Sequence, residues 1–70
     1  MITDPKKMFG QRLRELRKGK KITQEEFADM CELDRSYVAS IEQGRRNVSL
    51  ENIVKIVDAL GISLSEFFNW

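Results

Sequence analysis

The segment LDRSYVASIEQG, residues 33–44, carries side chains whose types and spacing suit hydrogen bonding to the edges of nucleic-acid bases. Arg35 can bond O6 and N7 of one guanine together, and Ser36 and Ser40 can bond a base on either strand. If the segment is a helix, the face that carries these residues has no bulky apolar side chain and no carboxylate to repel phosphate. This face is therefore a candidate contact surface for nucleic acid.

Other groups that could do chemistry have simpler explanations. Glu25 and Glu26 are adjacent in a predicted helix, so they do not face each other, and Glu26 is needed as a cap. Cys31 falls on the inward side of the same helix and is expected to be a small core residue. The absence of histidine excludes histidine-based catalysis and zinc binding, and a single cysteine forms no internal disulfide. We therefore expect no enzymatic activity, no metal and no cofactor.

Five helix signals position these side chains, and no strand signal competes with them. The first helix is opened by Asp4 with Pro5 at its first position, and Gly19 ends it. The second begins with a capping box, in which Thr23 and Glu26 bond each other's backbone N–H groups. Both helices carry apolar residues at helical spacing, which predicts one buried face on each.

Three further helices follow after short polar connections. Asp34 caps the third helix, which has Val38 and Ile41 inward and is stopped by Gly44. Ser49 caps the fourth helix, which is the most apolar and is expected to be central. A second capping box opens a short fifth helix. The sequence thus predicts an all-α fold, a compact five-helix bundle that forms one domain over residues 1–70.

The charges are unevenly distributed along the chain, although the net charge is only +1. Only Asp4 and Glu15 are acidic before Ile22, a part of the chain that is rich in lysine and arginine. After Asn47, Lys55 is the only basic residue. Near-neutrality therefore does not argue against a polyanionic partner, although a solvated basic face is the alternative. No apolar run is long enough to span a membrane or to form a signal peptide, so we expect a cytoplasmic protein.

The second and third predicted helices are both short and are joined by only about four residues, CELD. This arrangement is typical of a helix-turn-helix, here at about residues 23–43, in which the second helix enters the major groove of DNA. The face of residues 33–44 that is free of bulk and acid fits that role.

The stretch TQEEFADMCELDRSYVASIEQG resembles the DNA-binding core of the XRE family, to which the phage 434-type repressors belong. The matching features are Gln24 after the cap, Ala28 between the two helices, Val38 and Ile41 inward, and IEQG at the end of the recognition helix. The stretch LDRSYVASIEQGRRNVSL is especially similar to controller proteins of restriction–modification systems. The resemblance implies a lambda repressor-like fold and DNA binding by a small dimer that controls transcription next to its own promoter.

The resemblance also implies roles by position. Base reading falls to Arg35, Ser36 and Ser40. Contacts with the DNA backbone fall to Gln24, Tyr37, Gln43, Arg45, Arg46 and Asn47. A structural salt bridge is implied between Arg17 and Glu42. Alternatives remain for three of these groups: Arg35 and Ser36 as an exposed first turn, Tyr37 as a cover for the helix edge, and Arg45 and Arg46 as ordinary loop charges.

One residue departs from the family pattern, which commonly has glycine in the turn where this chain has Glu32. If Glu32 has a positive φ, the strain costs about 1 kcal/mol. The alternative is a turn of another geometry, which would change the pitch of the recognition helix.

Aromatic residues gather at the end of the chain, and a domain of this size cannot easily bury all of them. We expect a twofold dimer interface formed by Leu64, Phe67, Phe68 and Trp70. The alternative is that the aromatic residues close over the core of the monomer.

These observations together predict a homodimeric, sequence-specific transcriptional regulator with double-stranded DNA as its partner and no small-molecule ligand. Its site would be pseudo-palindromic. The rival functions on the same fold are an antitoxin, which usually carries an additional segment, and a protein-interaction module that has lost DNA binding.

Overall fold

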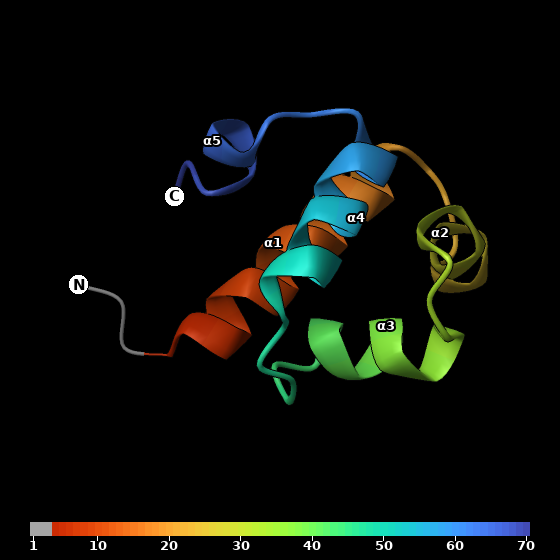
Figure 1. Cartoon of the computed structure of the whole chain (residues 1–70), viewed down its shortest axis with the longest axis horizontal. Helices are drawn as coiled ribbons and strands as arrows, with labels where there is room; N and C mark the ends of the chain where they lie inside the picture. Colours follow the sequence, from red (N-terminus) through yellow and green to blue (C-terminus); the bar gives the residue numbers. More distant parts are fainter. Residues whose placement is uncertain (1–3) are drawn as a thin grey trace.

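The computed structural model describes residues 4–70, so residues 1–3 of the expected domain lie outside the described part. Residues 4–70 form five helices and no strand (Figure 1). The helices are α1 (Pro5–Gly19), α2 (Gln24–Cys31), α3 (Arg35–Glu42), α4 (Leu50–Leu60) and α5 (Leu64–Phe67). The predicted all-α bundle with a helix-turn-helix is confirmed.

The helices begin where the capping residues predict. The side chains of Asp4, Thr23, Ser49 and Ser63 each accept a hydrogen bond from a backbone N–H in the first turn of their helix. Both predicted capping boxes are complete, with each glutamate bonded back to the cap residue. Asp34 is at the N-cap of α3 as expected, but its side chain makes no capping hydrogen bond there. At the start of α3 the backbone carbonyl of Asp34 accepts from the N–H of Val38 at 3.1 Å, without help from the Asp34 side chain.

One core joins the five helices. Its buried apolar side chains are Phe9, Leu13, Phe27, Ala28, Cys31, Val38, Ile41, Ile56, Val57, Leu60 and Phe67. α4, the helix expected to be central, contributes Ile56, Val57 and Leu60 to this core and packs on α2 and α5. Leu50 and Val54 in its first half are 72% and 40% exposed, so the fully buried side chains of α4 lie in its second half. α3 packs on α1 and α2.

Gly10 allows the close approach of α1 to α3, a contact that the sequence did not reveal. A Cβ atom at this position would lie 2.1 Å from the carbonyl oxygen of Ile41. Only a residue without a side chain fits there, because the obstacle is backbone rather than a movable side chain. Gly10 thereby sets the distance between the first helix and the predicted recognition helix.

The turn between α2 and α3 has the backbone geometry that favours glycine, although it contains Glu32. This residue has φ 58° and ψ 40°, the left-handed conformation. The turn therefore has the expected helix-turn-helix geometry, and Glu32 is in a strained left-handed backbone conformation.

We expect the substitution Glu32→Gly to raise the free energy of unfolding by about 0.5–1 kcal/mol. Relief of about 1–2 kcal/mol of left-handed strain outweighs the greater entropy of glycine in the unfolded chain. Urea denaturation of the two proteins measures the difference. The matched control is Asp29→Gly, at an exposed position within right-handed α2, which should lower the free energy of unfolding instead. A loss of stability at both positions would contradict the strain argument.

Cys31 is buried in the core, as its inward position predicted. Burial raises the pKa of its thiol to about 11, and the nearby charge of Lys55 acts weakly in the opposite direction. The thiol is therefore protonated at neutral pH, which suits a core residue and not a nucleophile.

Candidate nucleic-acid interface

The α2–turn–α3 unit presents α3 at the surface. Ala28 and Val38 are buried on the facing sides of the two helices, and the N–H of Leu33 in the turn bonds back to the carbonyl of Ala28. Figure 1 shows α3 at one end of the molecule, with no other helix on its outer side. This is the placement that entry of α3 into a groove requires.

Arg35 and Ser36 are exposed in the first turn of α3, with their side chains available for contact. Ser40 is less accessible, because its hydroxyl donates to the carbonyl of Tyr37 at 3.0 Å and accepts from Arg46 Nε at 3.1 Å. A hydroxyl has one donor and two acceptor positions, so Ser40 retains a single acceptor for a base. Of the three predicted base readers, Arg35 and Ser36 are therefore the better placed.

A cluster that spans three segments surrounds Tyr37. The guanidinium carbon of Arg46 lies 5.5 Å from the centroid of the Tyr37 ring. Asn52, in the first turn of α4, donates from Nδ2 to the Tyr37 hydroxyl at 3.1 Å. Sequence reasoning did not identify Asn52, because no spacing rule connects α3 with the first turn of α4.

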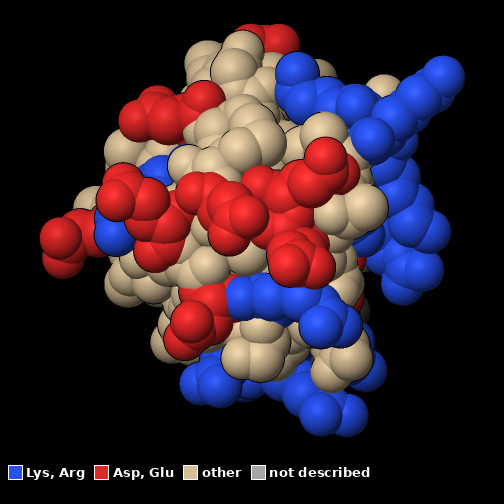
Figure 2. All heavy atoms as spheres, turned by 90° about the vertical axis from the view of Figure 1, so that its right-hand side faces the viewer, with Lys and Arg blue, Asp and Glu red and all other residues tan. Residues whose placement is uncertain are grey.

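The other predicted backbone contacts, Gln43, Arg45 and Asn47, are exposed in the connection after α3. Gly44, within this connection, has φ 76° and lies against Lys7 of α1. Figure 2 views the molecule from the side that carries α2, and acidic side chains cover the middle of that side. Lysines and arginines line its lower edge, the end of the molecule where α3 lies in Figure 1, and a second group of them lies along its upper right edge. A polyanion at the α3 end would therefore meet basic side chains and not the acidic middle of this side.

Arg17 and Glu42 form the expected salt bridge, and it is buried. Nε and the second terminal nitrogen of Arg17 donate to the two carboxylate oxygens of Glu42 at 2.7 and 2.9 Å. Only 9% of the Arg17 side chain and 2% of the Glu42 side chain are exposed. The hydrogen bonds with Glu42 raise the pKa of Arg17 against the opposing effect of burial, so the guanidinium stays charged. The pair joins α1 to the C-terminal end of α3.

Gln24 is tied to the same salt bridge. Its side-chain N–H donates to Glu42 Oε1 at 3.1 Å, and the residue is half-buried at the start of α2. The second N–H of the amide is the group that the expected phosphate contact would use. The position of Gln24 thus depends on Glu42, a coupling that the sequence did not indicate.

The predicted dimer contact through Phe67 is wrong. Phe67 is completely buried in the core of its own chain, with its ring centroid 4.7 Å from that of Phe9. Leu64, Phe68 and Trp70 are 44%, 39% and 45% exposed, as a contact surface requires. Spacing alone does not tell which side of a helix of one turn faces inward.

Arg12 holds this aromatic end against α1, a second contact that sequence reasoning did not find. Its side chain donates to the carbonyl oxygens of Phe67 at 2.8 Å and Glu66 at 2.7 Å. These carbonyls are at the C-terminal end of α5, and that of Glu66 also accepts from the backbone N–H of Asn69 at 3.3 Å.

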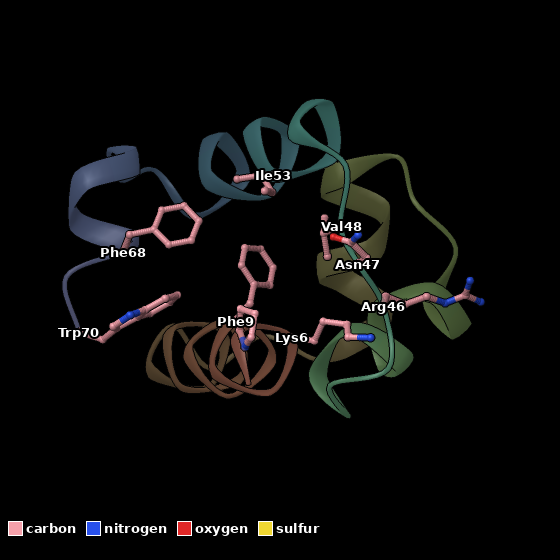
Figure 3. Close-up of a pocket in the computed structure, with 9 residues that line it drawn as sticks. Lys6, Phe9, Arg46, Asn47, Val48, Ile53, Phe68 and Trp70 are labelled. Atoms are coloured by element: carbon pink, nitrogen blue, oxygen red, sulfur yellow. The ribbon is translucent and has the colours of Figure 1, made fainter. Parts of the chain in front are cut away.

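A groove of about 190 Å³ separates this aromatic end from α4 and the start of α1 (Figure 3). Its lining residues are Pro5, Lys6, Phe9, Arg46, Asn47, Val48, Ile53, Phe68 and Trp70. Figure 3 shows the Arg46 guanidinium turned away from the groove, so the walls are mainly apolar. Among residues 4–70, no cluster of three acidic, cysteine or histidine side chains is placed to bind a metal ion. None of the described helices has the length and apolar character needed to cross a bilayer.

Comparison with known proteins gives concordant results. Residues 13–67 match the family described as Helix-turn-helix. Control protein C.MunI of Mycoplasma sp is 52% identical over 69 residues, 97% of this chain and 93% of that protein. The crystal structure of the restriction-modification controller protein C.AhdI from Aeromonas hydrophila matches with a TM-score of 0.87 and 54% identity, covering 90% of this chain and 96% of that one. The controller protein C.Esp1396I, a tetramer in complex with its natural 35-base-pair operator, matches with a TM-score of 0.85 and 30% identity, covering 91% and 84%.

Proposed function

The chain belongs to the helix-turn-helix family, in its XRE-type branch, and on that premise we propose that it is a sequence-specific DNA-binding regulator of transcription that controls a restriction–modification system. The observation that carries the proposal is the uncovered face of α3, with Arg35 and Ser36 exposed at its start. The similar C.Esp1396I controller is known in complex with operator DNA. This activity needs no catalytic group, and it places the protein with its DNA in the cytoplasm.

In this proposal α3 enters the major groove and its first turn reads the bases. Arg35 bonds a guanine in bidentate fashion, Ser36 bonds a neighbouring base, and Ser40 uses its one remaining acceptor. Contacts with phosphate come from Gln24 at the start of α2, from Tyr37, and from the loop residues Gln43, Arg45, Arg46 and Asn47. Phosphate contacts position the protein and make binding salt-dependent, whereas the base contacts supply specificity.

We further propose that two copies bind as a twofold dimer on a pseudo-palindromic site. Leu64, Phe68 and Trp70 supply exposed apolar area, and Leu50 and Val54 of α4 are also exposed. The two α3 helices would then enter successive major grooves about 34 Å apart. Sedimentation equilibrium tests the dimer, and a monomer at high protein concentration would contradict it.

A fluorescence anisotropy titration tests the function. The protein is added to a duplex from immediately upstream of its own gene and to a shuffled duplex, each at several salt concentrations. We expect tight binding to the native duplex and weak binding to the shuffled one, with a steep salt dependence. Equal, weak binding to both would count against control of its own promoter.

The substitution Arg35→Ala should cost about 1–3 kcal/mol of binding free energy on the native duplex and little on the shuffled one. The loss is selective because a bidentate contact with guanine exists only on the correct sequence. The same anisotropy titration measures it. The control is Arg14→Ala on the exposed side of α1, which should change both affinities little. Equal losses on both duplexes would reassign Arg35 to phosphate contact.

Two experiments distinguish the rival functions from the proposed regulator. An antitoxin would co-purify with the product of a neighbouring gene. A protein-interaction module would bind neither duplex at any salt concentration. The exposed Arg35 and Arg46 at the α3 end favour DNA binding over a protein-interaction module.

A further inference from the structure

We propose that Asn52 is a positioning residue for DNA binding, whose side-chain amide holds the Tyr37 hydroxyl so that its O–H donates to a DNA phosphate. This inference rests on the proposed function, because it requires a phosphate beside α3. It assigns a role to α4, which carries none of the DNA-contacting residues named above.

Asn52 starts from a well-held backbone. It is in the first turn of α4, and its own N–H donates to the hydroxyl of the cap residue Ser49 at 3.2 Å. From there Nδ2 reaches the Tyr37 hydroxyl at 3.1 Å, and both side chains are half-buried. The cap thus fixes the helix turn from which the amide reaches across to α3.

Arg46 makes a second contact with the Tyr37 side chain, over one face of its ring. Arg46 lies over the ring at 5.5 Å from its centroid, and Arg46 is itself bonded to Ser40 at 3.1 Å. Ser40 is in turn bonded to the carbonyl of Tyr37 at 3.0 Å. Arg46 thus contacts the face of the ring, and Asn52 contacts the hydroxyl, where its hydrogen bond restricts the direction of the O–H.

A phenol hydroxyl has one donor hydrogen and two acceptor positions. Asn52 supplies a donor to one acceptor position, so the hydrogen must point elsewhere. In the part of the chain from 4 to 70, no protein group accepts that hydrogen. A phosphate oxygen is an acceptor without a hydrogen of its own, so it complements the group that Asn52 leaves available. Without Asn52 the hydroxyl can rotate, and water competes for both of its roles.

The test is a double-mutant cycle on DNA affinity with Asn52→Ala, Tyr37→Phe and the double variant. Both duplexes are used, at several salt concentrations, because a phosphate contact is present on either. Each variant is first checked for native helix content and a cooperative melt by circular dichroism. Arg45→Ala, at an exposed loop position away from the Tyr37 ring contact, is the comparison for the loss of a charged phosphate contact.

We expect Tyr37→Phe to weaken binding about tenfold, as for loss of a hydrogen bond to a charged acceptor. Asn52→Ala should weaken it about three- to tenfold by itself, and hardly at all once Tyr37 is phenylalanine. Neither variant should change the salt dependence, because a neutral donor displaces no counterion, whereas Arg45→Ala should lower the slope by about one.

Three results would overturn the inference. Equal weakening by Asn52→Ala with tyrosine or phenylalanine at position 37 would mean that Asn52 bonds phosphate directly. A lower salt slope for Asn52→Ala would mean that it acts by supporting the basic loop. No effect of Tyr37→Phe would remove the phosphate contact itself. If the unmodified protein bound neither duplex, the proposed function itself would be wrong, and the inference about Asn52 would be wrong with it.

Discussion

The substitution Glu42→Gln should lower the free energy of unfolding by about 3–5 kcal/mol, the largest change expected from any single substitution considered. The side chain keeps its size but loses its charge, so Arg17 remains buried with an uncompensated guanidinium. Both carboxylate oxygens now accept from Arg17, and one also accepts from Gln24. Urea denaturation followed by circular dichroism measures the loss.

The control for Glu42→Gln is Glu15→Gln, at an exposed position on α1. This substitution makes the same chemical change at the surface, where we expect an effect within about 0.5 kcal/mol. Equal effects at the two positions would contradict the buried-charge argument. The double substitution Arg17→Met with Glu42→Leu removes both charges and should recover most of the loss, since a buried ion pair can often be replaced by well-packed apolar residues.

Substitution of Glu42 should also lower the affinity for DNA. Gln24 is held by Glu42 at the start of α2, where we propose that it bonds phosphate. We therefore expect Glu42→Gln to weaken binding to the native and shuffled duplexes alike, under conditions in which the protein remains folded. A selective loss on the native duplex would instead indicate a shift of α3.

The substitution Gly10→Ala should lower the free energy of unfolding by about 3 kcal/mol. The new Cβ would lie 2.1 Å from the carbonyl oxygen of Ile41 and 3.0 Å from that of Glu42. Because both obstacles are backbone atoms, α1 and α3 must move apart, which loosens the core and strains the Arg17–Glu42 bridge. Thermal and urea denaturation measure the change.

The chain contains its own control for Gly10→Ala. Gly19 is in the last turn of the same helix, and a Cβ there would meet nothing within 4 Å. Gly19→Ala should therefore stabilise the protein by up to about 1 kcal/mol through helix propensity. Stabilisation by both substitutions would show that α1 and α3 can separate at little cost, which would contradict the role assigned to Gly10.

Helix starts were predictable because each depends on residues close together in the chain. The capping boxes at Thr23 and Ser63 and the cap at Ser49 need only a hydroxyl and a backbone N–H three positions away. The inward faces of α2 and α3 followed from helical spacing for the same reason. Two predictions from local patterns failed in part. The side chain of Asp34 makes no capping hydrogen bond, and Phe67 is buried in the core of its own chain instead of facing a partner.

The sequence by itself determined the five helices, the helix-turn-helix and the exposure of Arg35 and Ser36, since these depend on short-range periodicity and capping. The Arg17–Glu42 bridge was expected only through family resemblance. Only the tertiary structure decided which distant groups meet: Gly10 with Ile41, Arg12 with the end of α5, and Asn52 with Tyr37. These contacts join residues 15 to 55 positions apart, and their partners are often backbone atoms, which every residue carries and no pattern of side chains can mark.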